Sequence, residues 1–277
     1  MTTSTSTTSS IASAGTAHGA TSGTPLSLDV RAVAKSYGRG PATRQILADV
    51  TFDVHQGEFV TVVGPSGAGK TTLLRCLAGL LAPDAGVVAL DGQKITAPPK
   101  GLSLVFQDYS RSLLPWMSVL RNVMLPLRRR GSNRAERLRL AEQALEAVGL
   151  ADAGSLYPWQ MSGGMQQRAA IARAVACQPQ VLLMDEPFAS VDAQTRADLE
   201  DLMLRLREEL RMTIVLVTHD IDEAVYLADR IIVLSGAPTS VTEIIAVPLP
   251  APRDQLRTKL EPAFAELRAH VLGLIRR

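Results

Sequence analysis

The sequence predicts an α/β protein with a mainly parallel core sheet, a small antiparallel β-subdomain and a helical subdomain. Continuous apolar runs rich in β-branched residues alternate along the chain with segments of helical period. This alternation is typical of parallel strands covered by helices on both faces. Shorter β-rich segments gather near the beginning of the chain, and the stretch 108–166 carries no strand signal. These three features indicate the three parts of the predicted fold.

The strands are expected from short apolar runs bounded by turn residues. The segments 26–33, 46–54 and 87–90, the last followed by an Asp91-Gly92 turn, are expected to form the antiparallel part. The parallel core is expected from five further runs: Phe59–Val63, Leu102–Phe106, Val181–Met184, Ile214–Val217 and Ile231–Leu234. Because ligands bind beyond the carboxyl ends of parallel strands, polar residues that follow these runs are expected to share one site.

The helices are expected from apolar positions that recur at helical spacing. They are predicted at 72–78, 133–150, 169–177 and 192–211. The last of these carries a stripe of leucines: Leu199, Leu202, Leu206 and Leu210. The C-terminal segment is also expected to be helical, and Pro262 should break it in two, because proline cannot continue a helix from the preceding turn.

One glycine-rich run lies between a predicted strand and a predicted helix: Gly64-Pro65-Ser66-Gly67-Ala68-Gly69-Lys70-Thr71-Thr72. It matches the P-loop pattern G-x-x-x-x-G-K-[ST] in the strand–turn–helix context which that pattern requires. The glycines let backbone N–H groups turn towards phosphate oxygens, and the helix N-terminus adds a positive dipole. Lys70 would reach the β- and γ-phosphates, and the Thr71 hydroxyl would bind Mg²⁺. The run therefore predicts a P-loop NTPase.

Other polar groups follow the predicted core strands. Asp185 ends a buried strand and is a candidate Mg²⁺ ligand, directly or through water, and Glu186 could polarise a water for in-line attack. His219 could hydrogen-bond the γ-phosphate, and the Gln107 amide could contact Mg²⁺ or the attacking water. Together with the P-loop, these residues predict one catalytic site.

A second glycine turn, Ser162-Gly163-Gly164, precedes an alanine-rich helix and forms another helix N-terminus suited to anions. A nucleotide that is already held by one P-loop has little use for this turn within the same chain. The turn is explained if it caps the γ-phosphate of a nucleotide held by another subunit. It therefore predicts a second copy of the chain as partner, in a head-to-tail dimer with nucleotide sandwiched between the copies.

In this order, the motifs resemble the ATP-binding subunits of ABC transporters over residues 28–236. The resemblance implies that ATP and Mg²⁺ are the cofactors and that Tyr37 stacks on the adenine ring. It implies that 64–72 is the Walker A motif and that Gln107 belongs to the Q-loop. It further implies that Asp185 is the Walker B aspartate and that Glu186 is the catalytic base.

The resemblance extends to three later motifs. Residues 162–166 resemble the Leu-Ser-Gly-Gly-Gln signature, 190–192 resemble the D-loop, and His219 corresponds to the switch histidine. The signature departs from the family pattern twice, because Met161 stands in place of Leu and Met165 in place of Gln. The resemblance thus implies four catalytic residues: Glu186, His219, Gln107 and Lys70.

A narrower resemblance, to the nitrate/sulfonate/taurine importer subfamily, rests on four segments: 113–119, 185–188, 218–224 and 253–256. It implies a subunit that hydrolyses ATP to power import of an anionic solute such as nitrate, an aliphatic sulfonate or taurine. The implied partners are integral membrane permease subunits and, indirectly, a solute-binding protein. The chain would then lie peripherally at the cytoplasmic face of the cell membrane. The apolar run around Trp116, beside the Q-loop, is the expected docking surface.

This interpretation gives the chain a definite organisation. A disordered tail rich in Thr, Ser and Ala is expected at 1–25, and an ABC ATPase domain at 26–250. The helical subdomain within it is expected at about 108–178, and a C-terminal helical extension at 251–277. No window approaches ~18 uninterrupted apolar residues, so no membrane span is predicted.

Three alternatives remain open from the sequence. A soluble ABC ATPase acting on nucleic acid or the ribosome would usually carry two ATPase modules or a long coiled-coil insertion. The net charge of +2 also predicts no nucleic-acid partner. A P-loop kinase or GTPase would leave the Ser162-Gly163-Gly164 turn unexplained. A non-enzymatic, nucleotide-dependent regulatory subunit is disfavoured by intact Lys70 and Glu186.

Overall fold

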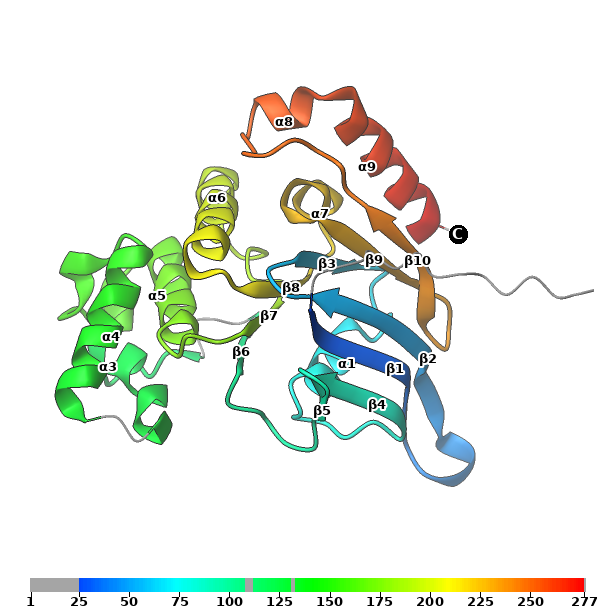
Figure 1. Cartoon of the computed structure of the whole chain (residues 1–277), viewed down its shortest axis with the longest axis horizontal. Coiled ribbons are helices and arrows are strands. Elements are labelled where there is room, and N and C mark those ends of the chain that lie inside the picture. The colour runs from blue at the N-terminus through cyan, green and yellow to red at the C-terminus, as the bar shows by residue number, and fades with distance from the viewer. Residues whose placement is uncertain (1–24, 108–111, 131–132, 277) are drawn as a thin grey trace, which may run out of the picture.

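A computed structural model describes residues 25–107, 112–130 and 133–276 of the chain. Its strands form two sheets (Figure 1). One is a four-stranded sheet of order β2-β1-β4-β5, and the other is a six-stranded sheet of order β10-β9-β3-β8-β7-β6. The predicted α/β fold, with a mainly parallel core sheet and a small antiparallel one, is confirmed. Residues 1–24 of the tail expected at 1–25 lie outside the described residues.

The four-stranded sheet is antiparallel throughout. It is made of β1 (Leu26–Tyr37), β2 (Arg44–His55), β4 (Ala85–Leu90) and β5 (Gln93–Lys94), with a short 3-10 helix, η1 (Gly40–Ala42), between β1 and β2. Alternate side chains such as Leu28 and Val30 are fully buried, which is the period expected of a half-buried sheet. Strands β1 and β2 run further than the apolar pattern predicts, because their paired ends are exposed and polar.

The six-stranded sheet is parallel except at one edge. Strands β3 (Phe59–Val63), β8 (Thr213–Val217), β7 (Val181–Asp185), β6 (Leu102–Val105) and β9 (Arg230–Ser235) pair in parallel. Strand β10 (Ser240–Ala246) adds antiparallel to β9. All residues of β3, β7 and β8 are buried, which is why continuous apolar runs predict them. The apolar pattern predicts no strand at β10, because this edge strand is half-exposed and carries Ser, Thr and Glu among its apolar residues.

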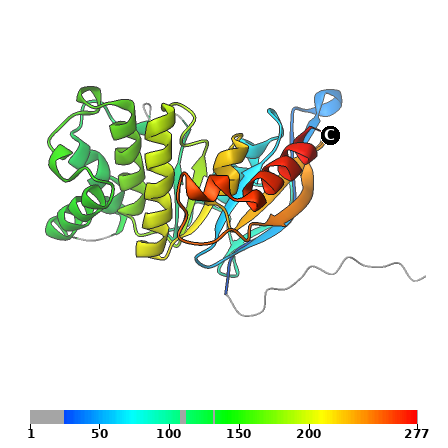
Figure 2. The ribbon, with the colours of Figure 1, turned by 90° about the horizontal axis from the view of Figure 1, so that it is seen from above.

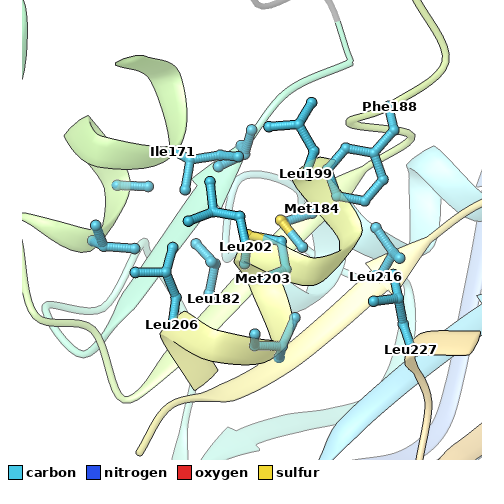
Figure 3. Packing of buried hydrophobic residues seen from close by; sticks show 14 of the residues in the cluster. Ile171, Leu182, Met184, Phe188, Leu199, Leu202, Met203, Leu206, Leu216 and Leu227 are labelled. Carbon is cyan, nitrogen blue, oxygen red and sulfur yellow. The ribbon is translucent and has the colours of Figure 1, made fainter. Parts of the chain in front are cut away.

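The two faces of this sheet pack into two separate cores. Phe59, Leu182 and Leu216 belong to one core, where the sheet meets α5 (Gly163–Val175), α6 (Ala193–Leu210) and α7 (Ile221–Leu227). Figure 3 shows Leu182, Met184 and Leu216 facing the leucine stripe of α6. The alternate residues Val60 and Leu183 belong to the other core, which contains α1 (Lys70–Leu77) and the antiparallel sheet. Each parallel strand is therefore fixed on both sides.

The described residues between β6 and β7 form only helices and 3-10 turns, gathered at one end of the molecule (Figure 1). These are α3 (Val119–Met124), η2 (Pro126–Arg130), α4 (Arg134–Ala147), η3 (Ala151–Ala153), η4 (Pro158–Gln160) and α5. A buried amide, that of Asn122, orders the loop before them. Its Nδ2 donates to the carbonyls of Leu114, Met117 and Ser118 at 3.0–3.1 Å. This clamp leaves Trp116 outside, 72% exposed.

The C-terminal segment forms two helices, α8 (Arg257–Leu260) and α9 (Pro262–Ile275), and Pro262 begins the second one. The predicted break at this proline is confirmed. Helix α9 lies across α7 and β9 (Figures 1 and 2). In the part of the chain that the structure describes, every helix is too short or too polar to cross a bilayer.

The packing predicts that shortening a central core side chain is costly. Leu216, on β8, is fully buried between the sheet and α6, so Leu216→Ala should lower the free energy of unfolding by about 2–5 kcal/mol. Leu210 at the end of α6 is 45% exposed, so Leu210→Ala should change it by less than about 0.5 kcal/mol. Chemical denaturation measures both, and equal losses would contradict the described packing.

Candidate active site

The loop between β3 and α1 requires glycine for two physical reasons. Gly67 and Gly69 have φ values of 80° and 74°, a region that disfavours L side chains. A Cβ at Gly64 would lie 2.6 Å from the Leu234 carbonyl oxygen, and one at Gly69 would lie 2.5 Å from Ile46 Cγ2. The loop is therefore compressed against β9 and β2, with its backbone turned around the N-terminus of α1. This is the geometry of a phosphate-binding loop.

Lys70 is a buried cation beneath this loop. Its Nζ donates hydrogen bonds to the carbonyls of Gly64 at 2.9 Å and Pro65 at 3.1 Å, and the residue is 7% exposed. Burial lowers the pKa of the Lys70 ammonium, while the nearby carboxylates of Glu186 and Asp185 raise it. An anion placed in the loop would favour the charged form of Lys70 further.

Asp185 ends β7 next to the start of α1. It accepts a hydrogen bond from the Thr71 hydroxyl at 3.4 Å and is 7% exposed. Burial raises the pKa of the Asp185 carboxyl, and the Thr71 hydroxyl opposes that rise. A hydroxyl and a buried carboxylate side by side form an oxygen donor set of the kind that Mg²⁺ prefers. The residues present therefore fit a magnesium ion bound beside the phosphate loop.

Glu186 joins three strand ends in one place. Its Oε2 accepts a hydrogen bond from Gln107 Nε2 at 2.9 Å and lies 3.1 Å from His219 Nδ1. Gln107 follows β6, Glu186 follows β7, and His219 follows β8. The Glu186 backbone has a φ of 43°, and its N–H donates to the Val217 carbonyl at 2.8 Å. A non-glycine residue in this conformation is strained, and among the described residues Glu186 is the one such residue that belongs to the candidate site.

The Ser162-Gly163-Gly164 segment lies at the start of α5. The helix begins at Gly163, earlier than the predicted 169, and the Ser162 side chain caps it by accepting from the Met165 N–H at 3.3 Å. Gly164 has no room for a side chain, because its Cβ would lie 2.6 Å from Thr195 of α6. Among the described residues, no hydrogen bond or ion pair connects this helix start with the phosphate loop. The structure therefore brings these two anion-binding elements into no direct contact within one chain.

Tyr37 ends β1 and is 43% exposed. It pairs with Arg44 across the hairpin, and Ile46, on the same strand as Arg44, packs against Gly69. Tyr37 therefore lies on the strand pair that covers the phosphate loop, with part of its ring open to solvent. This position is compatible with stacking on a base.

The sequence reasoning missed a group of residues around His219. Asp220 caps α7 by accepting from the N–H groups of Asp222 and Glu223, and it forms an ion pair with Arg196 of α6 at 3.0 Å. Glu223 lies in the first turn of α7 and is 4% exposed. The capping pattern of Asp220 with a glutamate three residues later is a sequence signal for this helix start that could have been found.

These residues together define an enzyme of the P-loop NTPase class. A compressed glycine loop and a buried lysine can hold phosphates, Thr71 and Asp185 can hold a metal ion, and Glu186 is a strained carboxylate at the same edge. Comparison with known proteins identifies the family. Residues 47–189 match the ABC transporter family model, and the chain belongs to that family. It is an ATPase whose ATP hydrolysis is coupled to transport.

Curated relatives align over most of the chain. An uncharacterised ABC transporter ATP-binding protein of Methanocaldococcus jannaschii is 45% identical over 83% of this chain and 84% of its own length. The nitrate import ATP-binding protein NrtD of Synechococcus elongatus is 41% identical over 86% of this chain and 87% of its own length. The bicarbonate transport ATP-binding protein CmpC of Synechocystis is 42% identical over 82% of this chain, which spans only 34% of that longer relative.

A solved structure has the same fold. The ATP-binding cassette MJ0796, in a dimeric post-hydrolysis state bound to ADP and Pi, superimposes with a TM-score of 0.70 and 34% sequence identity. The match covers 79% of this chain and 98% of the other. The fold assignment therefore rests on a structural likeness supported by substantial sequence identity.

The compressed loop predicts that alanine substitutions at two glycines will differ sharply in their effect on ATP affinity. Gly64→Ala should displace the phosphate loop from the Leu234 carbonyl and weaken ATP binding by at least about tenfold, a loss of ~1.4 kcal/mol. Gly92 has a φ of 75° and nothing within 4 Å of its Cβ position, so Gly92→Ala should cost some stability but leave ATP affinity unchanged. Equilibrium binding of a fluorescent ATP analogue measures both. Full affinity in Gly64→Ala would contradict the geometry of the loop.

Proposed function

We propose that this chain is the ATP-hydrolysing subunit of an importer for a small anionic solute, working as a head-to-tail pair of copies on membrane permease subunits. One observation carries the proposal. The Glu186 carboxylate is held by Gln107 and His219 at the sheet edge that also contains Lys70 and Asp185. This arrangement supplies a base, a phosphate-binding cation and a metal-binding carboxylate to the same reaction.

The first step is binding and orientation of ATP. The backbone N–H groups that follow Pro65 in the loop 64–72 and the Lys70 ammonium hold the β- and γ-phosphates, and Tyr37 stacks on the adenine. Thr71, Asp185 and Gln107 supply oxygen ligands for Mg²⁺, which when bound neutralises charge on the phosphates. Because little covalent chemistry is required of the protein, positioning and charge stabilisation account for most of the rate.

The second step is hydrolysis. A water in line with the γ-phosphorus attacks it while the Glu186 carboxylate takes up a proton from that water. The bond between the γ-phosphorus and the bridging oxygen breaks, and its electron pair leaves on ADP. His219 contacts the γ-phosphate from the end of β8. The distance of 3.1 Å between His219 Nδ1 and Glu186 Oε2 supports a role for both groups at the same phosphate.

A second copy is proposed to complete each site. The start of α5, capped by Ser162, presents free N–H groups and a positive dipole, yet no contact among the described residues ties it to the phosphate loop of its own chain. We assign Ser162, Gly163 and Gly164 to the γ-phosphate bound by the partner copy. The dimeric form of the cassette MJ0796 supports a paired assembly.

The surface for the permease is proposed on the helical part. The hydrogen bonds of Asn122 fix the loop so that Trp116 is exposed at the surface. The neighbouring Met117 lines a cleft of about 490 Å³. Apolar side chains line the cleft together with four arginines that have no polar side-chain partner among the described residues: Arg121, Arg128, Arg134 and Arg137. An apolar surface rimmed by positive charge suits an amphipathic segment bearing carboxylates. Docking there places the chain peripherally at the cytoplasmic face of the membrane.

The solute class is proposed from the relatives. The relatives reported above include proteins named for nitrate import and for bicarbonate transport, and both solutes are small anions. Nitrate, an aliphatic sulfonate or taurine remain the candidates that the motifs suggest, and a separate solute-binding protein would deliver them. The domain organisation proposed from the sequence, with an ATPase domain at 26–250, is retained. The comparisons give no support to an action on nucleic acid or the ribosome.

Replacing the proposed base should separate binding from turnover. Glu186→Gln keeps the size of the side chain and one acceptor oxygen but cannot take up the proton, so kcat should fall at least about a hundredfold while ATP still binds. The variant should then accumulate as an ATP-bound dimer, visible by gel filtration with light scattering. Lys70→Ala, as a comparison, should lose ATP affinity instead. Turnover within about threefold of the unaltered protein would remove Glu186 from the mechanism.

Mixing two inactive variants tests the composite site. Lys70→Ala removes the phosphate cation, and Gly163→Asp places a carboxylate where the partner's γ-phosphate must come, so each homodimer should be inactive. In a mixed head-to-tail dimer, one site carries both lesions and the other carries neither. ATPase assays of the mixture should therefore show recovered activity. Recovery would exclude a turn that acts within its own chain, whereas full activity from a strictly monomeric protein would exclude the dimer.

An exposed tryptophan beside the cleft should contribute to docking. Trp116→Ala should leave basal ATPase activity unchanged and reduce co-purification with the permease, because large buried aromatics dominate interfaces. Trp159 is a matched control, since it is also on the helical part and is 71% exposed, compared with 72% for Trp116. Trp159→Ala should leave the yield of complex unchanged. Equal yields for both variants would place the docking surface elsewhere.

A further inference from the structure

A small cavity lies directly behind the proposed catalytic pair. Its volume is about 20 Å³, which is room for a single water molecule. It is lined by residues from the ends of β7 and β8 and from helices α6 and α7: Glu186, Ala189, Arg196, Thr218, His219, Asp220 and Glu223. The proposed base and the switch histidine are therefore two of its walls.

Two buried polar atoms on the lining residues have no hydrogen-bond partner among the residues that the structure describes. These are Glu223 Oε1 and Arg196 Nε. A buried polar atom without a hydrogen bond is destabilising, and a charged group without one is more so. Glu223 is 4% exposed, so bulk solvent does not satisfy its carboxyl. A water molecule does not reach either atom, so the Glu223 carboxyl depends on its protein neighbours and on staying uncharged.

The same two residues hold the loop that carries His219. On one side of the histidine, the Thr218 hydroxyl hydrogen-bonds to the Glu223 side chain and accepts from the Asp220 N–H at 3.0 Å. On the other side, Asp220 Oδ2 pairs with Arg196 Nη1 at 3.0 Å. His219 itself is 58% exposed and lies 3.1 Å from Glu186. Its position is therefore set by its two neighbours rather than by packing of its own ring.

We propose that Glu223 is a positioning residue for ATP hydrolysis: its buried carboxyl holds Thr218 while Arg196 holds Asp220, and together they fix the Thr218–Asp220 loop so that His219 meets Glu186. The inference rests on the proposed function, because it takes Glu186 and His219 as the catalytic pair. It adds a residue that touches neither substrate nor reacting atoms and acts through its neighbours.

The charge state of Glu223 predicts a pH dependence of kcat in addition to the effect of removing its side chain. Glu200 and Arg196 face it from α6, Asp220 and His219 from the loop before α7, and Glu186 from the end of β7. Burial, together with Glu200 and Asp220, raises the pKa of the Glu223 carboxyl well above its ordinary value, and Thr218 and Arg196 oppose the rise. The carboxyl is thus neutral in the folded protein over a range where it would be ionised in the unfolded chain.

The direction of the pH effect follows from this. Between the ordinary pKa and the raised one, the folded state binds the proton and the unfolded state does not, so stability falls as pH rises through that window and is level above it. Once Glu223 ionises, its charge faces the carboxylates of Glu200, Asp220 and Glu186, and the loop that it holds is strained. The kcat of the unaltered protein should therefore decline on the alkaline side.

The test compares three full-length variants over about pH 6 to 9, with kcat and KM for ATP measured at each pH. Glu223→Ala should lower kcat at least about tenfold and leave KM within about twofold, because ATP contacts are kept and positioning is lost. Glu223→Gln, an uncharged isostere, should recover kcat to within about threefold and should lack the alkaline decline. Asp201→Asn is the control, since Asp201 is on α6, bonds to Tyr226 and does not line the cavity.

The outcomes separate this inference from the proposed function. An alkaline decline in Glu223→Gln identical to that of the unaltered protein would overturn the role of Glu223, as would a Glu223→Ala effect confined to KM. If Glu223→Ala does not fold, the pH profile of Glu223→Gln alone decides. Glu186→Gln is assayed in parallel. An active Glu186→Gln would contradict the proposed function itself, whereas an inactive one leaves that function standing whatever Glu223 does.

Discussion

The in-register parallel pairing of β6, β7, β8 and β3 is the constraint on which the rest of the molecule depends. Val62 of β3 pairs with Val217 of β8, and Val217 pairs with Asp185 of β7, so neighbouring strands end at the same level. The site residues that follow these strands, from the phosphate loop to His219, therefore lie at one edge of the sheet. The alternation of side chains into two cores holds each strand from both sides. The geometry of the candidate site is a consequence of this pairing.

Ionisable side chains are buried at that edge, and their charged forms are destabilising unless each has a partner of opposite charge. Lys70 and Asp185 are each 7% exposed. Burial lowers the pKa of Lys70 and raises that of Asp185, and both shifts favour the neutral form of the side chain. Glu186 adds backbone strain at a φ of 43°. Phosphates and a divalent cation bound there would offset these costs, because they would place negative charge beside Lys70 and positive charge beside Asp185. We infer that part of the affinity for nucleotide comes from relieving an arrangement that the sheet imposes.

Much of this could be predicted from the sequence because the buried strands carry continuous apolar runs and the loop motifs have fixed spacing. The strands β3, β7, β8 and β9 and the break at Pro262 follow from local pattern alone. What could not be predicted is set by tertiary contact. Strand β10 is half-exposed, the Asn122 clamp depends on a loop returning to the helix, and the Glu223 cavity forms only when α6 and α7 pack together. The roles assigned to the site residues still rest on resemblance and geometry.

The central claim is that one ATP is held by the phosphate loop of one copy and the start of α5 of another. A structure of the Glu186→Gln variant with ATP and Mg²⁺ tests this most directly. The account predicts two nucleotides at the interface, each with its γ-phosphate between Lys70 of one chain and Ser162 of the other, and Thr71 and Asp185 beside the cation. A nucleotide bound entirely by one chain, with Ser162 facing solvent, would contradict it.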